Sequence, residues 1–223
     1  MEIDFDKYPY PKLRHHTSAN MYFPASELEL LPEGYPPLYD NIDWSKRFAN
    51  KRLPDMLDIG CGKGFFLLHM AELYPEKNIL GIELRKGAVK WINSVIEGES
   101  IHNCSALWYS VINGMNFIKD KSIEKIFYLF PDPWPKRKQQ KRRLFREPFI
   151  KDCHRALKDD GVLYLATDLD YVHEHHLNEL ERSGIFNYNE IKSRDEWPLP
   201  YTNKENFCKR KDIEVYRLIC TKK

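Results

Sequence analysis

MLDIGCGKG, residues 56–64, is the segment from which the architecture of this chain follows. Its first four residues, Met56–Ile59, form a short apolar run that indicates a buried strand. Three glycines then occupy every second position, which indicates a tight turn where the backbone comes close to a ligand. A helix is expected over Phe65–Tyr74 and a second strand over Asn78–Ile82. Strand, turn, helix and strand make a βαβ unit, which predicts parallel pairing.

The same alternation continues to the end of the chain. Apolar periodicity predicts further helices over Ala88–Ile96, Phe145–Leu157 and Tyr171–Arg182, and further strands over Ala106–Tyr109, Ile123–Phe130, Gly161–Thr167, Phe186–Ile191 and Val215–Cys220. We therefore predict an α/β fold with a doubly wound, mostly parallel, seven-stranded, Rossmann-like sheet. The last strand is expected to insert antiparallel at the edge of the sheet.

Two regions differ in composition. Residues 1–54 are rich in proline and predict an irregular N-terminal arm with one short helix over Leu38–Phe48, whereas residues 55–223 predict a single domain. The arm carries aromatic side chains that either pack on the core or stack on a ligand, and packing is the favoured interpretation. These aromatic residues are Tyr8, Tyr10, Phe23 and Trp44.

Positive charge is concentrated in one place. The formal net charge of the 223 residues is only +2, with 35 basic and 33 acidic residues. Seven of the basic residues lie between positions 136 and 146, so the rest of the chain carries 28 basic against 33 acidic residues, a net charge of −5. Such a cluster favours a polyanionic partner bound in one orientation, with an affinity that falls steeply with salt.

Other classes of protein are disfavoured. The five cysteines are irregularly spaced and include no Cys-x-x-Cys pair, so neither a disulfide framework nor a zinc site is predicted. His173-Glu174-His175-His176 puts two imidazoles on one helix face, but no further ligand cluster accompanies it and no metal is expected. No apolar run approaches the length of a membrane span. We expect a cytoplasmic protein without a membrane partner.

The glycine turn and two carboxylates predict a cofactor site. Phe65 stands where a dinucleotide fingerprint needs its last glycine, and Asp58 would repel a pyrophosphate but suits a cation. Glu83 follows the turn by about 20 residues, the place from which a carboxylate binds a ribose diol. A positively charged nucleoside without phosphate fits best, which predicts S-adenosylmethionine. The alternative, that both acids only cap strand ends, stays open.

A rigid acidic turn precedes the basic cluster. In Phe130-Pro131-Asp132-Pro133-Trp134-Pro135-Lys136, three prolines fix the backbone and hold a carboxylate beside an indole at the end of a predicted strand. Each feature alone is usually an ordinary turn or a solvated face, but together they suit a flat base with phosphates nearby. Four acids fall near predicted strand ends, so we expect four carboxylates on one rim. They are Asp58, Glu83, Asp132 and Asp168.

These motifs resemble one known family. They are DIGCGKG at 58–64, GIEL at 81–84, FPDPWPK at 130–136, KRR at 141–143, TD at 167–168 and Thr202-x-x-Glu205. Together they resemble the tRNA (guanine-N7-)-methyltransferase family over roughly residues 42–220. The resemblance implies a class I methyltransferase fold. It also implies methyl transfer from S-adenosylmethionine to a guanine in the variable loop of tRNA.

The resemblance also implies a role for individual residues. Those expected at the cofactor are Asp58, Gly60, Gly62, Gly64, Glu83, Asn113 and Asp132, the last also as the carboxylate of the catalytic pocket. Those expected at the RNA substrate are Lys136, Lys138, Lys141, Arg142, Arg143, Asp168, Thr202 and Glu205. The chain departs from the family pattern at three positions: Asn113 replaces a frequent acid, Lys204 an aromatic residue, and Asp212 a glycine.

The expected chemistry needs no general base, because N7 of guanine carries an in-plane lone pair. Positioning in a site without water should supply most of the rate enhancement. An ionised carboxylate accepts both donors on the guanine edge, and either Asp132 or Asp168 could do so, helped by Glu205. We expect Asp132→Ala to abolish transfer but not cofactor binding, and Arg142→Ala with Arg143→Ala to weaken tRNA binding and its salt dependence.

Two rival functions remain at this point. An exocyclic-amine methyltransferase typically has Asp or Asn followed by two prolines and an aromatic residue, whereas here one proline precedes the acid and one follows it. An RNA-binding subunit with a vestigial cofactor pocket is disfavoured by the intact glycines and acids. The protein is expected to be a monomer or a homodimer.

Overall fold

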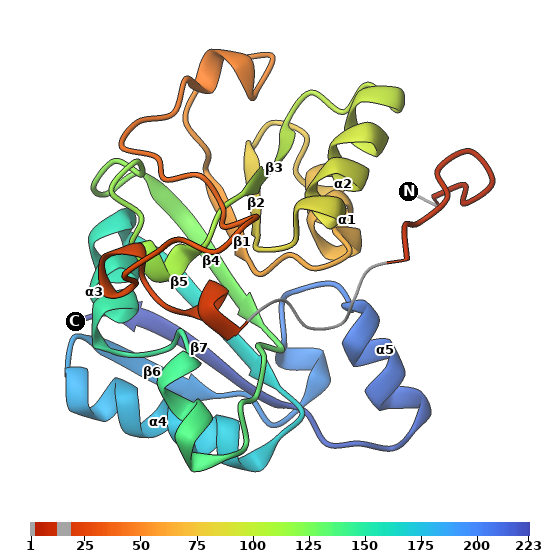
Figure 1. Cartoon of the computed structure of the whole chain (residues 1–223). Helices are drawn as coiled ribbons and strands as arrows, with labels where there is room; N and C mark the ends of the chain where they lie inside the picture. Colours follow the sequence, from red (N-terminus) through yellow and green to blue (C-terminus); the bar gives the residue numbers. More distant parts are fainter. Residues whose placement is uncertain (1–2, 13–18) are drawn as a thin grey trace. The chain divides into compact units, whose positions relative to one another are not determined.

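The computed structural model describes residues 3–12 and 19–223. The chain divides between Phe117 and Ile118 into two compact units (Figure 1). The described residues of the two units together contain seven strands. Along the chain, a helix connects the two strands of each parallel pair within a unit. This is the predicted mostly parallel α/β architecture.

The first unit contains two consecutive βαβ motifs. Its strands are β1 (Met56–Ile59), β2 (Ile79–Glu83) and β3 (Cys104–Trp108), in the spatial order β3-β2-β1. Both pairings are parallel. Helix α1 (Phe65–Leu73) connects β1 to β2, and α2 (Lys86–Gly98) connects β2 to β3. Every residue of β1 and β2 is buried, as is usual for parallel strands covered on both faces.

The glycine turn between β1 and α1 has a left-handed backbone at three positions. Gly60, Gly62 and Gly64 have φ angles of 75°, 59° and 76°, which residues with a Cβ rarely adopt. A Cβ on Gly64 would also lie 2.6 Å from Cγ1 of Ile92, a residue of α2. The glycines therefore shape the turn, and the last one lets α2 pack against the start of α1.

The N-terminal arm docks on the same unit. The indole Nε1 of Trp91 donates to the carbonyl of Tyr8 at 3.1 Å, and the Phe5 ring packs against Phe65 and Trp91. The short helix expected over Leu38–Phe48 is wrong, because only Trp44–Lys46 forms a single 3-10 turn. An isolated helix of this length does not repay the cost of nucleation. The observed turn is capped by the Asp43 side chain, which accepts from the backbone N–H of Ser45 at 3.1 Å.

The second unit holds the remaining four strands. They are β4 (Ile123–Leu129), β5 (Leu157–Thr167), β6 (Phe186–Glu190) and β7 (Tyr216–Lys222), in the spatial order β4-β5-β7-β6. Strands β4 and β5 are parallel, and β7 is antiparallel to both of its neighbours. The predicted antiparallel last strand is confirmed. It lies inside the sheet rather than at its edge, which is formed by β6, where Asn187, Asn189 and Glu190 are exposed.

Three helices accompany these strands. They are α3 (Glu147–Ala156), α4 (Asp170–Ser183) and α5 (Asn203–Arg210). His176 of α4 is almost fully buried among aromatic rings, and burial lowers its pKa to about 3. Among residues 3–12 and 19–223, no group of three or more side chains is arranged to hold a metal ion. None of the helices in this described part is long and apolar enough to cross a membrane.

Candidate active site

Asp58, the third residue of β1, is a buried carboxyl group with one oxygen that lacks a hydrogen-bond donor among the described residues. It is 3% exposed, and its Oδ2 accepts no hydrogen bond from the described residues. Burial, reinforced by the nearby Glu83 carboxylate, raises the pKa of Asp58 to about 8. A vacant acceptor beside a second carboxylate is an environment that a cationic donor such as an ammonium group would stabilise.

Glu83, the last residue of β2, ties the strand end to the glycine turn. One carboxylate oxygen accepts from the backbone N–H of Gly62 at 2.9 Å. The other accepts from the backbone N–H and Nε of Arg85, each at 2.9 Å. Glu83 is only 6% exposed, whereas the Arg85 side chain is partly exposed. A ribose diol could therefore reach Glu83 if the Arg85 guanidinium turned outward.

The glycine turn leaves room above its first residue. A Cβ built on Gly60 would meet no atom within 4 Å, and its φ of 75° already excludes most side chains. The backbone is thus accessible next to the vacant oxygen of Asp58. These features fit a ligand that combines a cationic amino acid with an uncharged nucleoside.

Asn113 lies in a 3-10 turn (Val111–Asn113) and holds the N-terminal arm in place. Its Oδ1 accepts from the backbone N–H of Ala25 at 2.7 Å, and its Nδ2 donates to the hydroxyl of Tyr35 at 2.9 Å and the carbonyl of Ser110 at 3.1 Å. Contact with adenine would require one of these bonds to be exchanged. The cofactor role of Asn113 stays a prediction.

In the second unit the acidic turn follows β4 and is held by the basic cluster. Phe130 and Trp134 have φ angles of 53° and 43°, unusual values for residues with a Cβ. The guanidinium of Arg143 donates to the carbonyl of Pro133 at 3.0 Å and that of Trp134 at 3.4 Å. Arg142 lies over the Trp134 ring at 4.9 Å. The two arginines therefore help to keep the strained turn in shape.

The residues of the acidic turn and basic cluster differ in exposure. Asp132 and the lysines at 136, 138 and 141 are exposed, whereas Arg142 is half-buried and Arg143 is 7% exposed. The exposed lysines have the accessibility that phosphate contacts require. Arg143 contacts the backbone of the acidic turn, which its position in a run of basic residues does not predict.

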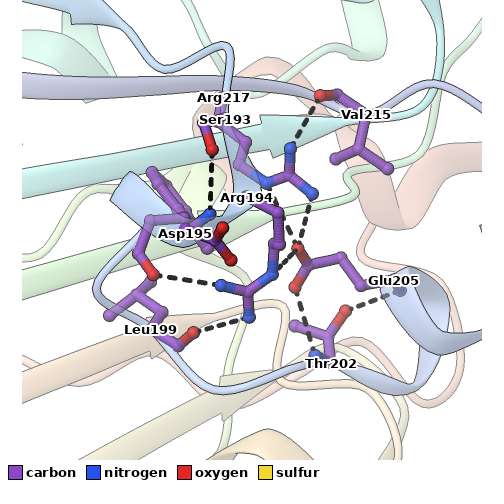
Figure 2. Close-up of polar contacts among 9 residues, drawn as sticks. Ser193, Arg194, Asp195, Leu199, Thr202, Glu205, Val215 and Arg217 are labelled. Carbon is purple, nitrogen blue, oxygen red and sulfur yellow. Dashed lines mark hydrogen bonds and ion pairs between the residues drawn. The ribbon is translucent and has the colours of Figure 1, made fainter. Parts of the chain in front are cut away.

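The remaining site residues lie around the start of α5. Asp168, which follows β5, forms an ion pair with Nζ of Lys204 at 2.7 Å. Thr202 and Glu205 form a capping box: the Glu205 N–H donates to Thr202 Oγ1 at 2.9 Å, and the Thr202 N–H donates to Glu205 Oε2 at 3.3 Å. Figure 2 shows this pair.

Glu205 is also the centre of a buried ion cluster. It is 2% exposed, and its Oε1 lies 2.9 Å from Nη2 of Arg217 and 3.3 Å from Nε of Arg194 (Figure 2). Helix α5 was not expected from apolar periodicity. The signal that could have found it is the Thr-x-x-Glu spacing, which is that of a capping box.

Each unit thus brings some of the predicted site residues together. Asp58, Glu83 and the glycine turn meet in the first unit, and Asp168 meets the start of α5 in the second. The gathering of all four predicted carboxylates on one rim stays a prediction.

The fold is shared with known methyltransferases. The chain is similar to the crystal structure of a precorrin-6y C5,15-methyltransferase from Geobacter metallireducens, with a TM-score of 0.52 and 19% identity over 77% of this chain and 82% of that one. It is also similar to a SAM-dependent methyltransferase from Aquifex aeolicus, with a TM-score of 0.51 and 16% identity over 81% and 90% of the two chains. The fold is that of a class I methyltransferase.

Sequence comparison narrows the class. Residues 52–218 match the family model described as "Putative methyltransferase". A relative from Thermosynechococcus vestitus is 31% identical over 78% of this chain and 83% of its own length, and one from Oceanobacillus iheyensis is 36% identical over 67% and 69%. A third, from Brevibacillus brevis, is 34% identical over 64% and 66%. All three are named tRNA (guanine-N(7)-)-methyltransferase. The chain belongs to the tRNA (guanine-N7-)-methyltransferase family, as its motifs predicted.

Proposed function

We propose that this protein transfers the methyl group of S-adenosylmethionine to N7 of a guanine in tRNA, and that this guanine lies in the variable loop. The observation that carries the proposal is the buried, vacant oxygen of Asp58 beside an open glycine turn, in a chain of this family. We also propose that the protein works in the cytoplasm. We expect a monomer or a homodimer.

The residues of the first unit suit the cofactor. Asp58 would accept from the ammonium group of the methionine moiety, and the open backbone at Gly60 would leave room for that moiety. Glu83 would bind the ribose diol and Asn113 the adenine. When bound, S-adenosylmethionine supplies an electrophilic methyl group.

The residues of the second unit suit guanine. N7 needs no deprotonation, so these residues act by holding the base and excluding water. An ionised carboxylate accepts the guanine N1–H and 2-amino group together. We assign this role to Asp132, because it is exposed on a stiff turn.

The basic cluster suits the tRNA backbone. Lys136, Lys138 and Lys141 are exposed and would contact phosphates, which position the RNA without reading its sequence. Arg142 and Arg143 would act from the inner side of the cluster, where they also support the acidic turn.

The test is incubation with unmodified tRNA and S-adenosylmethionine labelled in its methyl group, followed by digestion to nucleosides. Labelled 7-methylguanosine is expected, mapped to the variable loop. Asp132→Ala should lose the product while it binds S-adenosylhomocysteine as well as the wild type. A wild-type protein that binds tRNA but neither cofactor nor methyl label would instead be an RNA-binding subunit, and label in N²-methylguanosine would indicate an exocyclic-amine enzyme.

A further inference from the structure

Two large aromatic side chains are exposed at helix α5. Tyr201, just before the helix, is 38% exposed, and Phe207, within it, is 41% exposed. Each ring has a cation close by. The Arg194 guanidinium lies 4.0 Å and the Lys209 ammonium 5.1 Å from the Tyr201 ring centroid, and the Lys204 ammonium lies 5.2 Å from that of Phe207.

The charge presented by α5 is positive. The helix and the residue after it contain Lys204, Lys209, Arg210 and Lys211, and the last three are exposed. The one acidic residue of the helix, Glu205, is 2% exposed and is paired with two arginines. The helix therefore presents cations and aromatic rings to solvent, while its own carboxylate is turned inward.

The support of this surface is rigid. The capping box fixes the first turn of α5, and Cys208 on the inner side of the helix is completely buried. Arg217 from β7 and Arg194 both hold Glu205 (Figure 2). Because the helix is anchored at its inner face, the outward rings are presented with little conformational freedom left to lose on binding.

We propose that Tyr201, Phe207, Lys209, Arg210 and Lys211, here called the α5 face, bind unpaired nucleotides of the tRNA substrate by stacking and phosphate contact. The inference rests on the proposed function and adds a second RNA contact to the basic cluster at 136–146. Aromatic rings interleaved with Lys and Arg are the chemistry that binds single-stranded nucleic acid without sequence preference. Base-paired regions hide their ring faces, so the occupant is a loop or an opened strand.

The test measures RNA affinity across a salt series with S-adenosylhomocysteine bound. Tyr201→Leu with Phe207→Leu keeps apolar bulk but removes the flat ring faces. We expect tRNA affinity to fall by about tenfold or more, because base–aromatic stacking is lost, with an unchanged salt slope. Lys209→Ala with Arg210→Ala should instead lower that slope, by about 0.7 for each phosphate of the single strand that is no longer neutralised.

Matched controls separate the outcomes. Leu30→Ala, at a side chain that is 83% exposed in the other unit, should leave RNA affinity unchanged. The double leucine variant should lose affinity for a single-stranded oligonucleotide but not for a duplex of the same length. Wild-type affinity for both tRNA and the single strand in that variant would overturn the inference. Absence of 7-methylguanosine from the wild type would overturn the proposed function alone, because these binding measurements do not depend on turnover.

Discussion

At the scale of single residues, Asp58 shows how burial prepares a site. A carboxyl group removed from water and placed near Glu83 favours its neutral form, so its pKa is raised to about 8. A bound ammonium group would favour the carboxylate instead. We therefore expect cofactor binding to be coupled to proton loss at Asp58.

The coupling gives a pH prediction. Below pH 8 the unliganded protein holds a proton on Asp58, and binding of S-adenosylhomocysteine, which carries the same ammonium group, should release it. Affinity should therefore rise with pH up to about 8 and then level off. Titration calorimetry at pH 7 in buffers with different ionisation enthalpies measures the released proton.

Asp58→Asn is the matched variant for this measurement. It should release no proton and bind at least about tenfold more weakly, a loss of about 1.4 kcal/mol. Equal proton release in the variant and the wild type would assign the titration to another group.

Glu205 gives a stability prediction. Glu205→Ala would leave two arginines without their carboxylate partner: Arg194 and Arg217, the latter only 8% exposed. It would also remove one of the two hydrogen bonds of the capping box. Breaking a buried ion pair from one side costs about 3–5 kcal/mol. Urea denaturation should show a loss of this size, whereas Glu196→Ala, at an exposed position nearby, should lie within about 0.5 kcal/mol of the wild type.

The same variant separates two roles for Glu205. If the carboxylate only supports α5, its removal lowers stability and turnover together. Normal stability combined with abolished turnover would instead indicate direct contact with guanine.

At the scale of elements, the acidic turn and the basic cluster form one structural unit. The Arg143 guanidinium folds back on the carbonyls of Pro133 and Trp134, and Arg142 covers the indole. The proline-rich sequence makes the turn stiff, but these contacts select its shape. We therefore expect the exposed Lys138 and the buried Arg143 to have different functions, although both belong to the basic cluster.

Variants of the cluster should fall into two groups. Lys138→Ala with Lys141→Ala should lower the salt slope of tRNA binding by about 0.7–0.9 for each phosphate that is no longer neutralised, and leave the melting temperature unchanged. Arg143→Ala should lower stability by about 1–3 kcal/mol, because two carbonyls of the turn lose their donor, and should reduce turnover. Salt-dependent filter binding and thermal melting measure the two effects.

The opposite pattern would contradict this division. If Arg143→Ala changed only the salt slope, its side chain would bind RNA directly. If the lysine variants lowered the melting temperature, the lysines would support the turn.

At the scale of the whole molecule, the five cysteines behave as core residues. All five lie in the described part of the chain, and all are free and buried. Burial raises the pKa of each thiol and so disfavours the reactive thiolate. The expectation from sequence that they form no disulfide framework agrees with this arrangement.

Thiol reactivity tests the arrangement. The native protein should react slowly with an aromatic disulfide reagent at pH 8, and denaturant should release five reactive thiols. Rapid reaction of one or more thiols in the native state would show that the core opens locally at that position.

The sequence by itself determined the order of the seven strands and of helices α1 to α4, because burial on a strand or helix face leaves a local period in the apolar residues. It also determined the glycine turn with its two acids and the rigid acidic turn, since these depend on backbone preferences of neighbouring residues. The observed bounds of helices and strands differ from the predicted bounds by a few residues where the ends of an element lack strong sequence signals. Helix α2 begins at Lys86 rather than Ala88, and strand β5 begins at Leu157 rather than Gly161.

Only the tertiary structure decided which polar side chains are partners. Glu205 meets arginines from two other segments, Asn113 meets the distant arm, and Arg143 turns inward although the lysines at 138 and 141 in the same run point to solvent. The missed helix α5 belongs here too, because a buried ion cluster rather than an apolar stripe anchors it. The local period of apolar residues in the sequence indicates which positions are buried. The stability of a buried charge depends on desolvation and on a partner that is far away in sequence, and both exist only once the chain has folded.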